Sequence, residues 1–191
     1  MPAISPLFPS QFPDDIKQII ETAKLPDLAN RRANPSLNSQ ITAWIQANRS
    51  ASARNSSSPE KVDLILAGLW LLEGDLDASH ERSQKWETPT GSYWHAIMHR
   101  REGDFGNSKY WYRRIKKHPA AQHFQELLQS QNLYPEHTKE LSGKKDLLAF
   151  LESWVDLNQQ TIRNPNDSTR VSAVTELAWL EWQILMYHTL S

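Results

Sequence analysis

Three histidines and one glutamate stand at spacings that could bring their side chains to one place. His95 and His99 are four residues apart, and Glu102 follows His99 by three. On an α-helix these spacings put all three side chains on one face. His80 belongs to the helix predicted before it, and consecutive helices joined by a short link usually pack against each other. The sequence therefore predicts that three imidazoles and a carboxylate converge.

Such a set could hold a divalent metal ion. His80, His95 and His99 would be the ligands of Zn²⁺ or Fe²⁺, with one coordination position left open. Without a metal, His95, His99 and Glu102 could serve as a catalytic general acid and base. The pattern lacks the Glu that follows the first His in metalloproteases, because Ala96 stands there. The alternative is a buried, hydrogen-bonded network in which the histidines only stabilise packing.

The stretch around these residues is basic and aromatic. Between Gly91 and His118 the chain has seven Lys or Arg against two acidic residues, about +5, whereas the whole chain has a net charge of −1. This positive field would attract an anionic small molecule, which paired arginines and aromatic rings suit. The predicted ligand-binding residues of this polar pocket are Trp94, Tyr110, Trp111, Arg113 and Arg114.

Two alternatives bear on this basic stretch. Arg100 could pair locally with Asp104 instead of facing a ligand. Basic residues among aromatics also occur in proteins that bind single-stranded nucleic acid. The slightly negative net charge and the short patch argue against nucleic acid as the main partner.

Helical periodicity predicts the elements that position these residues. Apolar residues recur at helical spacing through most of the chain, and no alternation of period two persists. The fold class is therefore all-α, a single compact domain of about seven to nine helices over residues 14–191, preceded by a Pro-rich arm at residues 1–13. The segment 62–72 is apolar nearly all round and the segment 169–190 is strongly apolar, so we expect both in the core. Residues 48–58 and the surroundings of Pro135 are expected to be loops.

Local signals set the ends of the helices in the middle of the chain. Gly103 should close the helix at 92–102, and Asn107 or Ser108 could cap the next one. Ser58 followed by Pro59 is a typical helix start. Three short helices in succession would then frame the unusual residues.

Composition limits the class of protein. The chain has no cysteine, which excludes disulfides and thiolate ligands, so a metal would need His and carboxylate ligands. The first residues lack the basic and apolar regions of a signal peptide, and no segment is long and apolar enough to cross a membrane. We expect a soluble, cytoplasmic protein, and the sequence does not indicate its oligomeric state.

The central stretch also resembles a family signature. The segment from Tyr93 to Glu102, the run from Asn107 to Arg114, and the pair His118 and Pro119 look like the core signature of a group of bacterial helical proteins. Glu181 and Trp182 in the last helix look like the end of the same group. The resemblance implies a helical fold and brings with it no activity, substrate or catalytic residue.

Two hypotheses follow for the function. The first is a helical protein that binds an anionic small molecule in a pocket rich in His, Arg and Trp, with metal-dependent catalysis as its sharper form. The second is a non-catalytic binding module in which the His, Arg and Glu side chains form a structural network.

Overall fold

The structure, a computed structural model, describes residues 12–23, 28–29, 35–52 and 58–191. Within these residues the protein is all-helical and has no strand, as the sequence predicts, with ten helices instead of seven to nine. The helices are α1 (Asp14–Thr22), α2 (Pro35–Ser52), α3 (Pro59–Glu73), α4 (Leu76–Ser83), α5 (Pro89–Glu102), α6 (Phe105–Arg114), α7 (Pro119–Ser130), α8 (Pro135–Ser142), α9 (Leu147–Arg163) and α10 (Ser168–Leu190).

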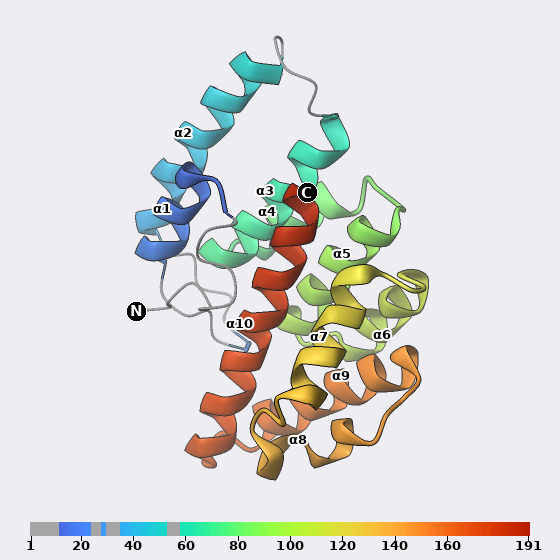
Figure 1. Cartoon of the computed structure of the whole chain (residues 1–191). Helices are drawn as coiled ribbons and strands as arrows, with labels where there is room; N and C mark the ends of the chain where they lie inside the picture. The colour runs from blue at the N-terminus through green and yellow to red at the C-terminus, as the bar shows by residue number, and fades with distance from the viewer. Residues whose placement is uncertain (1–11, 24–27, 30–34, 53–57) are drawn as a thin grey trace.

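The long C-terminal helix α10 is the centre of the packing. It contacts α3, α5, α7, α8 and α9, while α1 and α2 lie on the opposite side of it from α7 and α9 (Figure 1). Helices α3 and α10 are mostly buried, as their apolar sequences predict. Their side chains belong to one hydrophobic core. Among the described helices, none combines the length and apolarity that a membrane span requires.

The predicted loop around Pro135 is wrong, because residues 135–142 form α8. Proline suits the first turn of a helix, where its missing N–H has no partner to lose. Helix α8 buries only Thr138 and Leu141, so it carries little apolar periodicity that a sequence analysis could detect. Tyr134 precedes it with a positive φ of 51° and donates a hydrogen bond to Glu176 of α10.

Other expected boundaries also shift. The expected loop at 48–58 is helical up to Ser52, since a Ser- and Ala-rich run without Gly or Pro does not stop a helix; residues 53–57 lie outside the described part. The N-cap of α6 is Asp104, not Asn107 or Ser108. Of the expected arm at 1–13, only residues 12 and 13 are described, and Phe12 is buried.

The link between α4 and α5 is held close to the start of α5. Thr88 caps α5 by accepting a hydrogen bond from the Gly91 amide. A Cβ on Gly91 would lie 2.0 Å from the backbone oxygen of Trp86, so the close approach requires glycine. This contact fixes how α4 returns to α5, and hence where His80 lies relative to the histidines of α5.

A fully buried carboxylate joins four helices. Glu181 of α10 accepts hydrogen bonds from Arg100 of α5 at 2.5 Å, Tyr112 of α6 at 2.7 Å and Trp154 of α9 at 3.0 Å. Arg100 also donates to the Tyr112 hydroxyl at 2.6 Å. Burial disfavours the charge on Arg100, but Glu181 together with Tyr112 and Tyr93 outweighs this effect, and the pKa of Arg100 is raised. The partner of Arg100 is thus Glu181, and the expected local pair with Asp104 is wrong.

Histidine 118 is an unusual N-cap. Its Nδ1 accepts a hydrogen bond from the Ala120 amide at 3.1 Å, so in the neutral ring Nε2 carries the hydrogen and donates to Thr90 Oγ1 at 3.1 Å. The rings of Tyr93 and His188 face it at centroid distances of 5.4 and 6.5 Å. Burial, with a smaller contribution from His188, lowers the pKa of His118 to about 4. At neutral pH this side chain is therefore an uncharged structural cap.

Replacing Gly91 should disturb the α4–α5 link. Gly91→Ala forces Cβ against a backbone carbonyl, and we expect a loss of about 1–3 kcal/mol in the free energy of unfolding. Gly106→Ala is the matched control, because its nearest non-neighbouring atom would be 3.7 Å from Cβ; alanine there should be neutral or stabilise by up to about 1 kcal/mol. Urea unfolding of both variants measures the difference, and equal midpoints would contradict the proposed constraint.

Removing the charge of Glu181 should destabilise the protein severely. Glu181→Gln leaves the Arg100 guanidinium buried without an anion, and we expect a loss of about 3–5 kcal/mol. Arg100→Met should cost a similar amount, whereas the double variant should lose clearly less than the sum of the two. Chemical unfolding of the four proteins gives the coupling free energy. Additive losses would show that the two charges do not stabilise each other.

The pH dependence of stability should contain a contribution from His118. Because its pKa is lowered from 6.5 to about 4, the unfolded chain binds a proton in this window that the folded chain does not. The contribution is complete above pH 6.5 and is lost as the pH falls toward 4, by about 2 kcal/mol between about pH 7 and about pH 5. His118→Asn keeps a capping oxygen but does not titrate. Unfolding at both pH values should show a smaller drop for this variant; an unchanged drop would refute the assignment.

Candidate functional site

Helices α4 and α5 bring three imidazoles together. His80 lies on α4, and His95 and His99 lie one turn apart on α5. One ligand nitrogen from each ring lies within 4.8 Å of those of the other two. The ring centroids of His80 are 4.8 Å from His95 and 5.5 Å from His99, and the latter two stack at 4.7 Å. The convergence predicted from helical spacing is therefore present in the structure.

The cluster is largely shielded from water. His95 and His99 are buried, with exposed fractions of 3% and 7%, and His80 is partly buried. Burial lowers the pKa of His95 to about 3, and the neighbouring rings of His99 and His80 add to the effect. Burial also lowers the pKa of His99, although a hydrogen bond from its ring to Glu102 opposes this. Both rings are thus neutral near pH 7, the state in which imidazole binds metals.

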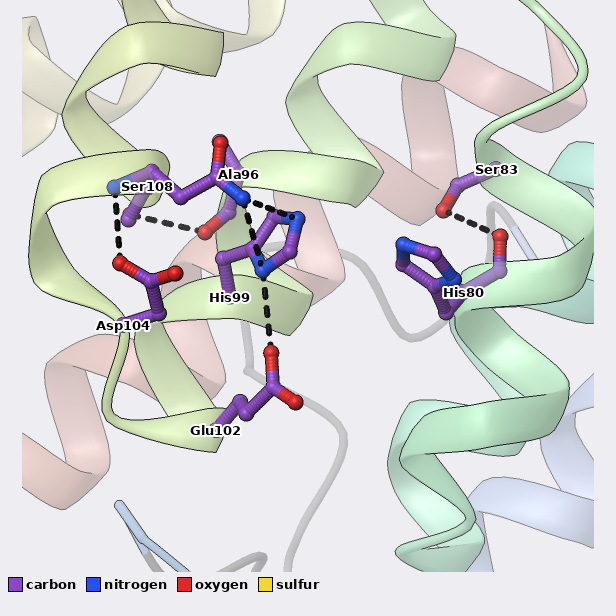
Figure 2. A network of polar contacts seen from close by, with 8 residues as sticks. His80, Ser83, Ala96, His99, Glu102, Asp104 and Ser108 are labelled. Atoms are coloured by element: carbon purple, nitrogen blue, oxygen red, sulfur yellow. Dashed lines mark hydrogen bonds and ion pairs between the residues drawn. The ribbon is translucent and has the colours of Figure 1, made fainter.

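Two neighbouring side chains hold the His99 ring. Nδ1 lies 3.0 Å from Glu102 Oε2 (Figure 2). The side-chain amide nitrogen of Asn107 lies 3.0 Å from Nε2 and 3.5 Å from Nδ1, so it rests over the face of the ring. Figure 2 also shows His80 across a gap, facing the His99 ring. A carboxylate that fixes one nitrogen of a histidine and leaves the other for a metal is a recurrent arrangement around metal ligands.

The His95 ring is held by an aromatic contact. It stacks on the indole of Trp111 at a centroid distance of 4.1 Å and an angle of 15°. Its Nδ1 is buried and has no hydrogen-bond partner among the described residues. A buried polar nitrogen without a partner costs free energy, so a bound ligand at this ring would be stabilising.

Helix α6 closes the cluster because its first turn is tied to α5. Gly103 ends α5 with a positive φ of 91°. Asp104 caps α6 because its side chain accepts a hydrogen bond from the backbone N–H of Asn107 at 3.0 Å. Ser108 then donates to the backbone oxygen of Ala96 at 2.8 Å (Figure 2). These bonds place the Asn107 side chain against His99.

The predicted anion-binding arginines are engaged by carboxylates. Arg113 pairs with Glu152 of α9 at 2.6 Å, and Arg114 pairs with Glu87 in the α4–α5 link at 2.6 Å. Neither arginine is hydrogen-bonded to a histidine of the cluster in the described part of the chain. Arg114 lies over the indole of Trp111, which stacks on His95; its guanidinium carbon is 5.1 Å from the Trp111 ring centroid.

The two remaining residues predicted to bind ligand lie in contrasting places. Tyr110 is 48% exposed, with its ring edge-on to Trp111 and its hydroxyl bonded to Arg114. Trp94 is fully buried, donates to Thr189 Oγ1 of α10 at 3.1 Å, and is therefore part of the core.

A small cavity lies beside α5, and none of the three histidines lines it. Its volume of about 20 Å³ is room for about one water molecule. It is lined by Leu28, Ile97, Arg100, Arg101, Asn158, Ala178 and Trp182. This space is too small for an organic anion, so the cavity does not serve as the predicted ligand pocket.

Sequence reasoning missed the role of Asn107 and of Glu181. Asn107 was considered only as a cap, and its contact with His99 depends on the turn between α5 and α6. Glu181 contacts partners as far as 81 residues away in the chain, so no local pattern reveals it. An acidic residue within a mostly apolar helix was the physical signal available.

Comparison with known proteins adds no assignment. No model of a known protein family matches the chain. No curated protein sequence and no solved structure matches it at a significant level.

Proposed function

We propose that this chain binds a divalent transition-metal ion, Zn²⁺ first and Fe²⁺ second, through His80, His95 and His99. The observation that carries the proposal is that three nitrogens from these side chains lie within 4.8 Å of one another. In a tetrahedral zinc site, bonds of 2.0–2.1 Å put the ligand nitrogens about 3.4 Å apart. Small side-chain rotations would close this difference.

Three further features support a metal site. The buried rings of α5 are neutral near pH 7, so binding an ion would not first require removing protons from them. Glu102 already accepts from His99 Nδ1 and so leaves Nε2 as the basic nitrogen. Coordination through Nδ1 of His95 would give this unpaired nitrogen a partner.

The proposed ligand of the metal is a small oxygen anion. Three protein ligands leave a position that water or an anionic molecule can occupy. The sequence suggested that Arg113 and Arg114 attract the anion, but both are paired with carboxylates. The metal ion would supply the positive charge instead. A water molecule on such an ion is a potential nucleophile, so hydrolysis of an anionic substrate is the chemistry that this arrangement supports.

The alternative, a non-catalytic interaction module, has less support. It relied on exposed tryptophans as contact residues for a partner. Of the eight tryptophans, five are buried and three are partly buried. In the buried Arg100–Glu181 network, the charged residues stabilise the packing of the helices. This network does not involve the three histidines.

Metal binding should depend on the cluster and not on histidine in general. Untagged protein, stripped with a chelator and titrated with Zn²⁺ in a calorimeter, should bind close to one ion per chain. His95→Ala/His99→Ala removes two of the three ligands, so we expect at least a hundred-fold loss of affinity. Co²⁺ bound at the site should give the visible absorption bands of tetrahedral cobalt. The variant should lack these bands.

Two controls make this test decisive. His123→Ala/His137→Ala removes the same number of imidazoles elsewhere and should bind Zn²⁺ like the natural chain. His80→Ala changes a less buried ligand and should lose affinity while the circular dichroism spectrum stays helical. Absence of binding by the folded natural chain, or equal binding by the His95/His99 variant, would refute the proposal.

A further inference from the structure

The ring of His95 lies nearly parallel to two other rings. It stacks on His99 at a centroid distance of 4.7 Å with 26° between the ring planes, and on Trp111 at 4.1 Å with 15°. The indole of Trp111 is itself held, because the guanidinium carbon of Arg114 lies 5.1 Å from its centroid and the ring of Tyr110 meets it edge-on. The plane of the His95 ring is therefore set by stacking.

Coordination of one ion by both His95 and His99 requires a different arrangement of these two rings. The lone pair of an imidazole nitrogen lies in the plane of the ring, so a shared ion must lie close to both planes, at about 2.1 Å from a nitrogen of each. Two stacked rings with centroids 4.7 Å apart and planes 26° from parallel have planes that meet only well beyond this bond length. One of the two rings must therefore turn out of the stack before both can bind the same ion.

The contacts of the two rings decide which of them turns. His99 is hydrogen-bonded through Nδ1 to the carboxylate of Glu102 at 3.0 Å, and the amide nitrogen of Asn107 rests over its face. The buried Nδ1 of His95 has no hydrogen-bond partner among the described residues. A hydrogen bond to a carboxylate stabilises more than a stacked pair of rings does, so turning His95 costs less free energy than turning His99.

We propose, resting on the metal site proposed above, that the His95 ring has two positions: stacked on the indole of Trp111 when no metal is bound, and turned to bind the ion through Nδ1 when one is. Because the two rings are nearly parallel in the stack, this turn separates His95 from Trp111. Trp111 is in this view an affinity-determining residue, which stabilises the metal-free site and so opposes metal binding. Occupancy of the site is thereby coupled to an indole of α6 that contacts the exposed Tyr110.

Nuclear magnetic resonance can follow the turn in the natural chain. Without metal, the ring protons of His95 should give nuclear Overhauser effects to the indole protons of Trp111, because the ring centroids are 4.1 Å apart. One equivalent of Zn²⁺ should remove or strongly weaken these effects while the protein stays folded. Effects that persist at full strength once Zn²⁺ is bound would show that His95 does not turn.

Replacing the indole should tighten metal binding. In Trp111→Leu the metal-free site loses the stacking contact, so calorimetry should show Zn²⁺ binding about two- to ten-fold more tightly than in the natural chain. Trp111→Phe keeps an aromatic face and should lie between the two. Trp179→Leu removes an indole that stacks on Trp182 within α10, and this matched control should leave the affinity unchanged.

The outcomes separate this inference from the proposed function. Weaker or unchanged Zn²⁺ binding by folded Trp111→Leu would overturn the role of Trp111 and leave the metal site standing. If that variant does not fold, Trp111→Phe and the spectra of the natural chain decide the question. Failure of the folded natural chain to bind Zn²⁺ would instead refute the proposed function, and the turn of His95 with it.

Discussion

The position of the whole site depends on one buried carboxylate. Glu181 has no exposed surface, and its oxygens accept hydrogen bonds from α5, α6 and α9. A buried charge is tolerated only where its partners are in place, so these helices cannot shift independently of α10. The contact therefore fixes the rotation of α5 and α6 about their own axes, and the remaining faces of these helices carry the histidine cluster.

Neighbouring residues on α5 and α6 show how this works. Arg100 binds Glu181, and His99 beside it in sequence faces the cluster. On α6, Tyr112 binds Glu181, while Trp111 stacks on His95. Because successive residues on a helix point about 100° apart, anchoring one side chain orients the next. The structural network and the candidate metal site are thus two sides of the same pair of helices.

How much could be predicted from the sequence depends on how far apart in the chain the interacting residues lie. Helical periodicity and the caps are local, so the helical class and the convergence of His80, His95 and His99 could be derived. Helix α8 was missed because it buries only two residues. The partners of Arg113 and Arg114 lie 39 and 27 residues away, and their choice depends on how whole helices pack.

Two polar centres lie on α5: the Arg100–Glu181 network and the histidine cluster. Their charges explain why an anion would bind only at the histidine cluster. Arg100 and Glu181 balance each other within the protein, and tyrosine and tryptophan donors complete the hydrogen bonding. Among the described residues the three imidazoles have no buried carboxylate of this kind: Glu102, which is hydrogen-bonded to His99, has a side chain that is 44% exposed, and Asp104, which also acts on His99, is exposed. A doubly charged ion there would leave a net positive charge in a largely buried place, which is unfavourable unless an anion joins it. The proposed metal would therefore draw an oxygen anion or hydroxide into its open position.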